Sequence, residues 1–325
     1  MILNETDFQH NSWKKLVVLQ VTSVFLCLSV LFSMFTPFPL AMGNIIYGRQ
    51  KALITGVISA VIVSILSVYV FKDISLLTFF LYSLSVSFII SEAFHRGWSP
   101  MKGVVRSGIV IVSLIVVLAG MAMMSTQKPV KETLTDWVAS YKVEMEQKLS
   151  EANSRDKDEI LKAFAKPETL ANEILKQAPN YIFAGTFFSL WINFLLILRG
   201  LKVPLLIKKY PYGENDLMSF KVPEYLVWLL ILGMGFYLAG IKLSWGETYE
   251  RIGLFTMYSM GVFYFFQGVG IYTRFLNFIR ISGFLKTFML IITVVSLNKY
   301  LALAGVLDVW VNFDRFFNRQ KDQGE

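Results

Sequence analysis

The sequence has little of the side-chain chemistry that builds disulfides or transition-metal sites. Its single cysteine, Cys27, lies in an apolar run, so no intrachain disulfide can form. It has two histidines, His10 and His95, and no cluster of cysteine with histidine. A zinc or haem site built on these residues is therefore not expected.

Charge is scarce as well. Charged residues are 17% of the 325 residues, whereas a soluble domain carries about a quarter. Hydrophobic residues are 55%, and the mean hydropathy is +0.54. Because the deficit of charge falls in two long apolar blocks, lipid is the expected solvent there. These features predict an integral membrane protein whose first partner is the lipid bilayer.

Recognisable catalytic motifs are missing. The sequence has no HExxH, no GxSxG, no P-loop and no paired carboxylates in a membrane span. Gly233, Gly235 and Gly240 lie inside an apolar run with the wrong spacing for a dinucleotide loop. We therefore expect no enzyme, no catalytic residues, no cofactor and no metal. The net charge of +8 does not indicate nucleic acid, because the basic residues lie in short loops, a pattern typical of membrane topology.

What the sequence does have is a polar stretch between two apolar blocks. We divide the chain into an N-terminal transmembrane block at 1–125, an extramembrane helical insert at 126–180, and a C-terminal transmembrane block with a tail at 181–325. Between Gln127 and Pro179 lie nine basic and ten acidic residues. This insert should face water.

Apolar residues recur in the insert at steps of three and four, which predicts amphipathic helices. One helix follows Pro129 and carries Trp137 and Tyr141 on its apolar face. A second opens at Asp156, and a third begins at Pro167 and ends before Pro179. They form either a helical cap on the membrane domain or a surface that docks a partner.

The predicted fold is an all-α polytopic transmembrane helical bundle of about eight spans plus one short, broken helix. The spans are expected at Leu16–Phe35, Ala52–Phe71, Ile74–Ala93, Val104–Met124, Tyr181–Leu198, Tyr225–Leu243, Ile252–Tyr272 and Thr287–Leu307. The short piece, Phe38–Tyr47, is about 15 Å long as a helix and cannot cross a core of about 30 Å unaided. Pro37 and Pro39 should prevent a regular helix before Pro39. The piece is therefore re-entrant or a broken crossing.

Two neighbouring spans carry small residues at four-residue spacing, which lets helices approach closely. We predict that they form a hairpin and pack stripe to stripe. The two stripes are Gly56, Ala60 and Ser64 on the first helix, and Ser83, Ser87 and Ser91 on the second.

Basic residues in the short loops predict the orientation. If Phe38–Tyr47 crosses, fifteen Lys and Arg lie in the loops of one face and three in those of the other. Since positive charge favours the cytoplasmic side, the insert should lie outside a bacterial cytoplasmic (inner) membrane. The cytoplasmic face includes a basic, aromatic loop with Glu92, Arg96, Trp98 and Arg106. Charged residues at span ends, Asp308 among them, should reach water.

Six residues are candidates for ligand binding: Pro37, Pro39, Asn44, Gln267, Asn298 and Lys299. The first three belong to the broken piece, and Gln267 ends an aromatic run. Lys299 falls near the middle of its predicted span, where an unpaired ammonium is costly. Either it faces the protein interior, with Gln267 as its first-choice partner, or the helix breaks at Asn298 and Lys299 and both lie at an interface.

Several stretches together resemble the YybS-like predicted membrane proteins of bacteria. They are Thr36-Pro37-Phe38-Pro39 with Gly48, Val222-Pro223, Phe266-Gln267-Gly268 and Gly305-Val306-Leu307-Asp308. The resemblance covers most of the chain apart from the insert. Its N-terminal half is similar in outline to the substrate-binding (S) components of energy-coupling-factor transporters and to the rod-shape protein MreD. That implies a membrane pocket capped by Phe38–Tyr47.

The sequence departs from the S-component pattern at one point. S components present Ala-x-x-x-Ala on their first helix to dock a coupling subunit, and Leu16–Phe35 contains no alanine. This argues against coupling to such a transporter. Two functions stay open: a component that binds or helps transport a small molecule of unknown identity, and a non-catalytic scaffold that recruits a membrane protein partner through the insert.

Overall fold

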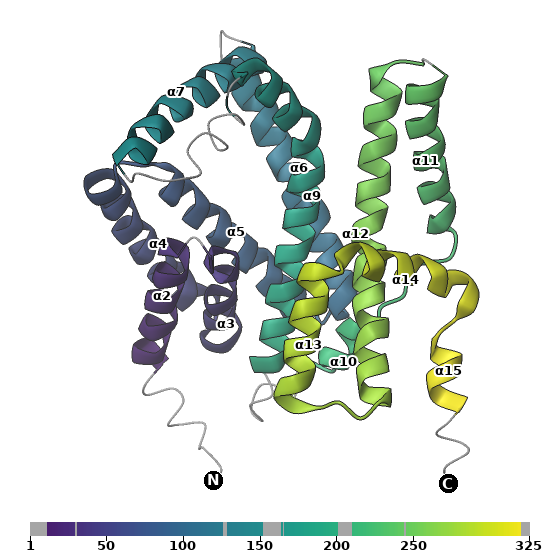
Figure 1. Ribbon diagram of the computed structural model, residues 1–325. Coiled ribbons are helices and arrows are strands. Elements are labelled where there is room, and N and C mark those ends of the chain that lie inside the picture. The colour runs from purple at the N-terminus through teal and green to yellow at the C-terminus, as the bar shows by residue number, and fades with distance from the viewer. Residues whose placement is uncertain are drawn as a thin grey trace. The chain divides into compact units, whose positions relative to one another are not determined.

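The structure is a computed structural model, and it describes residues 12–29, 31–125, 129–151, 164, 166–200, 210–243 and 245–319. Every regular element in these ranges is a helix, which confirms the all-α class (Figure 1). The elements are α2 (Ser12–Leu28), η1 (Ser33–Phe35), α3 (Pro37–Tyr47), α4 (Arg49–Ile65), η2 (Leu66–Phe71), α5 (Ser75–His95), α6 (Pro100–Ser125), α7 (Val130–Glu151), α9 (Pro167–Gly200), α10 (Glu214–Met218), α11 (Leu226–Lys242), α12 (Glu247–Phe278), α13 (Gly283–Ser296), α14 (Asn298–Val311) and α15 (Asp314–Arg319).

Within the described ranges, five helices are long and apolar enough to cross a membrane. They are α4 with η2, α5, α6, α9 and α12. The pair α13 and α14 would make a sixth, bent by 96° at its break. The predicted count of eight is not confirmed: α2 and α11 each have 17 residues, and α2 ends at Leu28 rather than Phe35.

Residues far apart in sequence form two compact units. The first contains 1–111, 186–227 and 260–325, and the second contains 112–185 and 228–259. The helices α6, α9 and α12 contribute residues to both. The two units are therefore described separately.

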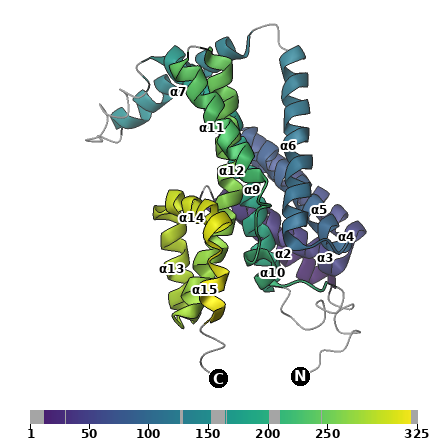
Figure 2. The same ribbon diagram turned by 90° about the vertical axis from the view of Figure 1, so that its right-hand side faces the viewer.

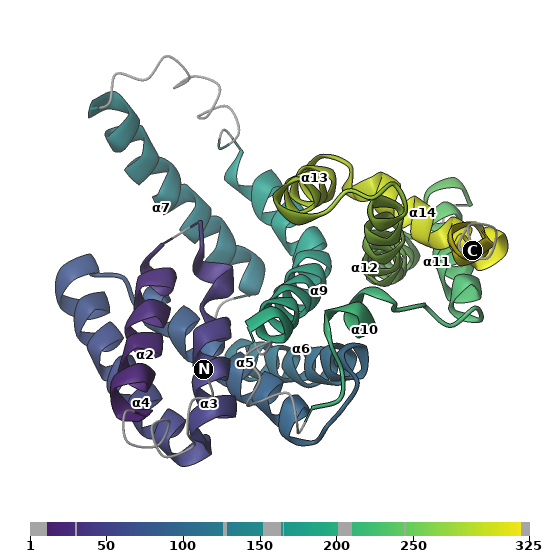
Figure 3. The same cartoon turned by 90° about the horizontal axis from the view of Figure 1, so that it is seen from below.

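In the first unit, α2, α3, α4 and α5 lie together, with the short α3 against both α2 and α5 (Figure 3). The helix α3 begins at Pro37, two residues earlier than predicted, because prolines are tolerated in a first turn, whose N–H groups have no intrahelical partner. Its 11 residues span about 16 Å, so it is as short as predicted. Gly48, at φ +91°, turns the chain sharply into α4.

The serine stripe of α5, Ser83, Ser87 and Ser91, lies inside the protein. All three are buried, and the Ser91 hydroxyl donates to the Ala41 carbonyl of α3 over 3.3 Å. At Ser91 the partner is therefore α3 rather than the small residues of α4 that the stripe was predicted to meet. On α4, Gly56 meets Leu84, and the Ser59 hydroxyl contacts Gln20 of α2 at 3.2 Å. The small residues of α4 thus accommodate bulky or polar partners.

In the second unit, α11 packs along the first part of α12 (Figures 1 and 2). A Cβ at Gly253 would lie 2.6 Å from the Gly233 carbonyl oxygen and 2.8 Å from the Tyr237 Cα. Gly253 and Gly233 therefore bring the two backbones into contact. An ion pair of 2.6 Å joins Lys176 of α9 to Glu250 of α12.

The insert differs from its predicted form at its C-terminal end. The helix α7 begins directly after Pro129, as predicted. The second predicted helix, at Asp156, lies outside the described residues. The third does not end before Pro179, because the 34-residue helix α9 continues through that proline to Gly200. Proline in a helix costs about 3 kcal/mol, and buried apolar side chains further along α9, such as Phe187, Leu190 and Phe194, offset that cost.

Candidate functional site

A tight turn between α5 and α6 builds the candidate site. Gly97 has φ +63°, its N–H donates to Phe94, and the N–H of Trp98 donates to Ala93 over 3.1 Å. This pattern closes the C-terminus of a helix around a left-handed glycine. The turn places the end of α5 beside the start of α6.

Aromatic packing fixes this turn. The Tyr210 hydroxyl donates to the Trp98 carbonyl over 2.6 Å, and its ring packs on Phe94 at 4.6 Å between centroids. Phe94 in turn stacks on Phe194 of α9. Burial raises the pKa of the Tyr210 hydroxyl, so it stays protonated and able to donate.

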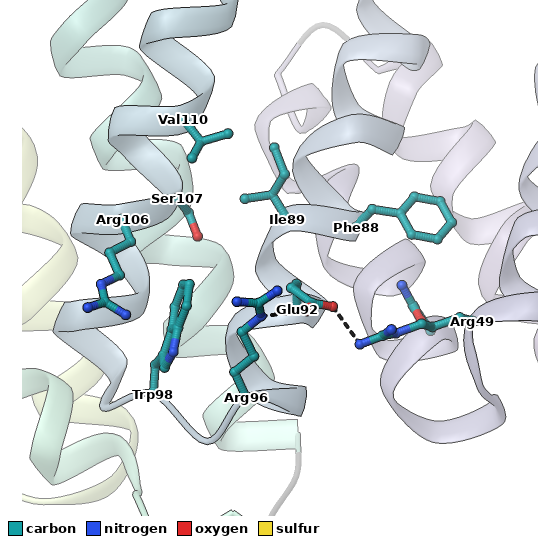
Figure 4. A pocket seen from close by; sticks show the side chains of 10 residues that line it. Arg49, Phe88, Ile89, Glu92, Arg96, Trp98, Arg106, Ser107 and Val110 are labelled. Atoms are coloured by element: carbon teal, nitrogen blue, oxygen red, sulfur yellow. Dashed lines mark hydrogen bonds and ion pairs between the residues drawn. The ribbon is translucent and has the colours of Figure 1, made fainter.

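A cavity of about 460 Å³ opens beside the turn (Figure 4). Its lining combines three arginines and one carboxylate with an indole, two small polar side chains and three apolar ones. We call it the arginine cavity, and it is lined by Asn44, Arg49, Phe88, Ile89, Glu92, Arg96, Trp98, Arg106, Ser107 and Val110.

One carboxylate serves two of the three arginines. Glu92 accepts from Arg49 over 2.5 Å and from Arg96 over 2.6 Å. The lining therefore carries a formal charge of +2. Within the described chain, no carboxylate forms an ion pair with Arg106.

Trp98 holds two of the guanidinium groups. Its ring lies between Arg96 and Arg106, whose guanidinium carbons are 5.6 and 4.6 Å from the ring centroid (Figure 4). Stacking on an indole face orders a guanidinium while leaving its N–H groups able to donate at the ring edge. The cavity therefore presents more ordered hydrogen-bond donors, the guanidinium N–H groups, than its single carboxylate can accept from.

Two buried polar atoms of the lining lack a protein partner among the described residues. They are Asn44 Oδ1 and Ser107 Oγ, in residues that are 2% and 1% exposed. A buried polar group left without a hydrogen bond costs about 1–3 kcal/mol. A bound molecule with its own polar groups would satisfy them.

Of the six predicted residues, only Asn44 lines this cavity. Pro37 and Pro39 are buried in the first turn of α3. Asn298 and Lys299 are exposed, and they open α14 directly after the chain bends. The helix break at this pair was the second of the two alternatives for Lys299, and it is the one the structure contains.

Gln267 lies elsewhere, and its partner is Asp308 rather than Lys299. The Gln267 amide donates to Asp308 Oδ2 over 2.8 Å and accepts from the Val222 N–H over 2.9 Å. Asp308 Oδ1 accepts from the Phe313 N–H over 2.7 Å. Asp308 is 4% exposed, so the prediction that it reaches water is wrong. These hydrogen bonds satisfy its carboxylate inside the protein.

Two glycines allow the helices to meet at this junction. A Cβ at Gly268 of α12 would lie 2.6 Å from the Leu301 carbonyl carbon, and one at Gly305 of α14 would lie 2.8 Å from that of Tyr264. Each glycine therefore receives a backbone carbonyl of the other helix. We call this contact, with Val222, Gln267 and Asp308, the α12–α14 junction.

Sequence reasoning missed most of the arginine cavity, although it singled out the loop that forms it. Glu92, Arg96, Trp98 and Arg106 read as an interfacial loop because each lies at the end of a span. The sequence did not show that Arg49 and Asn44 line the same cavity as these loop residues. Their spacing along the chain does not predict that they lie together.

A comparison with known protein families agrees with a membrane protein. Residues 16–309 match a family described as predicted membrane protein (DUF2232). A search of the curated proteins and a search of the solved structures each found no match. The matched range contains every residue of the arginine cavity and of the α12–α14 junction. The chain therefore belongs to the DUF2232 family of predicted membrane proteins.

Proposed function

We propose that this protein binds a small molecule in the arginine cavity and serves as a transport-related component, without catalysis, of a bacterial cytoplasmic membrane. The observation that carries the proposal is the pair of unpartnered buried atoms, Asn44 Oδ1 and Ser107 Oγ, in a lining with a formal charge of +2. Concave sites with a few convergent polar groups are the usual ligand sites of proteins.

The resemblance to YybS-like proteins and S components supports the same reading. It implied a pocket capped by the short second helix, and α3 supplies Asn44 to the cavity. The arginines lie on the face that the basic loops predict to be cytoplasmic. A ligand would then reach the cavity from the cytoplasm or from the adjoining leaflet.

Thermal stabilisation by a metabolite library tests the proposal. We expect anionic members to raise the melting temperature of the purified chain, and to raise it less in Arg96→Gln. Arg251→Gln is the matched control, because Arg251 is an exposed arginine of α12 that pairs with Glu247 outside the cavity. If no member stabilises the chain, or if both variants respond alike, the arginine cavity is not the binding site.

Ser107→Ala gives a second test that separates binding from folding. The hydroxyl has no hydrogen-bond partner in the described protein, so its removal should leave the ligand-free stability unchanged or higher. Affinity for a stabilising ligand should fall about two- to tenfold. Unchanged affinity would show that the ligand does not use this hydroxyl.

A scaffold function is the alternative, and α7 is what favours it. Trp137 is 58% exposed, and its ring stacks on the exposed Tyr141 at 5.5 Å. Large apolar side chains left exposed together often mark a binding surface. Replacing both by serine should release a co-purifying membrane protein partner if the insert recruits one, and should change nothing if the insert is only a cap.

A further inference from the structure

We propose that the ligand of the arginine cavity is an anionic amphiphile, with a phosphate head held by Arg96 and Arg106 and an apolar tail lying along α5 and α6. This inference rests on the proposed function and names its ligand class. The cavity is polar at one end and apolar at the other, and the two ends lie in the order that an amphiphile in a bilayer requires.

The polar end lies at the ends of two candidate spans. Glu92 lies in the last turn of α5, Arg96 follows its last residue, and Arg106 lies in the second turn of α6. Basic pockets between membrane helices at the cytoplasmic side bind phosphate head groups. Guanidinium groups match a phosphate because their paired N–H groups donate to two of its oxygens.

Only part of the positive charge is neutralised inside the protein. Glu92 bonds Arg49 and Arg96, whereas Arg106 rests on Trp98 alone within the described residues. A monoanionic or dianionic head would therefore complete the charge balance of the lining. A hydroxyl beside the phosphate could donate to Asn44 Oδ1, and an ester oxygen could accept from the Ser107 hydroxyl.

The apolar end lies one turn further into the same helices. Phe88 and Ile89 precede Glu92 on α5, and Val110 follows Arg106 on α6 (Figure 4). Val110 is 53% exposed and lies on a helix apolar enough to span a membrane. A tail attached to the head would leave the cavity along this apolar surface. A soluble anion would use the arginines and leave this end empty.

Calorimetric titration of the full chain in a nonionic detergent tests the inference with three probes. The probes are dioctanoyl phosphatidic acid, dioctanoyl phosphatidylcholine with the same tails, and sodium phosphate as the head alone. We expect phosphatidic acid to bind at least tenfold more tightly than either of the others. Arg106→Gln should weaken it about ten- to 100-fold, since a charge-assisted bond is lost, and Arg251→Gln should not.

Each other outcome is decisive. Sodium phosphate binding as tightly as phosphatidic acid would overturn the amphiphile and leave the proposed small-molecule site standing. Equal binding of phosphatidylcholine, or equal loss in Arg251→Gln, would show that tails or overall charge drive the binding, and would overturn the inference. Arg106→Lys, which keeps the charge without the paired donors, should bind between the wild type and Arg106→Gln.

Discussion

Gly268→Ala should be strongly destabilising, because it adds a methyl group where the backbones of two helices touch. The glycine faces the backbone of α14, and the new Cβ would overlap the Leu301 carbonyl oxygen and lie 2.6 Å from its carbonyl carbon. Ordinary contact begins at 3.4 Å. The obstacle is backbone rather than a side-chain tip, so no rotamer change relieves it.

The structure sets the size of the effect. Clearing the carbonyl carbon alone requires the helices to separate by about 0.8 Å, and clearing the nearer carbonyl oxygen requires more, so the 2.8 Å bond between Gln267 and Asp308 would lengthen to about 3.6 Å or beyond. Overpacking a core costs about 1–3 kcal/mol, and each buried group left unbonded costs about the same. After the gain in helix propensity of up to about 1 kcal/mol, we expect a net loss of about 2–4 kcal/mol.

Thermal unfolding of the purified chain in detergent measures this loss. Gly261→Ala in the same helix is the matched control, because a Cβ there meets nothing within 4 Å. The control should melt at or slightly above the wild-type temperature, and Gly268→Ala about 4–8 °C below it. If the two alanine variants melt alike, α12 and α14 do not approach as closely as described.

Four further predictions test other parts of the molecule. Gly108→Ala should lower the melting temperature, since its Cβ would overlap the buried ring of Phe187; a tolerated alanine would refute that contact. Asp308→Asn should destabilise by about 1–3 kcal/mol, because one of its two acceptor positions becomes a donor facing an N–H; wild-type melting would refute the pairing. Ser140→Cys, with Cys27 replaced, should react with an impermeant thiol reagent in intact spheroplasts, and reaction only after permeabilisation would reverse the predicted orientation. Lys299→Leu should change the unfolding free energy by less than about 0.5 kcal/mol, because Lys299 is exposed at a bend; a larger loss would place it in a packed site.

Local pattern was enough to find most of the helices. The spans at 52–71, 74–93 and 104–124 match α4 with η2, α5 and α6, because a long apolar run between charged loops has one stable form in lipid. Pattern failed at Pro179, where a local rule predicts a helix end, whereas α9 continues and buries apolar side chains further along, which outweighs the missing hydrogen bond. It failed again after Leu28, where an apolar run continues although the helix does not.

The site was less predictable than the fold, because its parts come together only through tertiary contact. Asn44 was named from a broken helix and Arg106 from a basic loop, yet nothing in either stretch indicates the other. For Asp308, local position led to a wrong prediction. Its position at the end of an apolar run suggested exposure to water, whereas Gln267, 41 residues away in sequence, supplies the hydrogen bond that makes burial affordable.

The paired glycines of the α12–α14 junction have a consequence for how such sequences can diverge. Gly268 and Gly305 each receive a carbonyl of the opposite helix, so a side chain at either one pushes the same two helices apart. Once one has changed, the second change meets a wider gap and costs less, which makes the two substitutions non-additive. In an alignment of relatives, these two columns should therefore vary together or not at all.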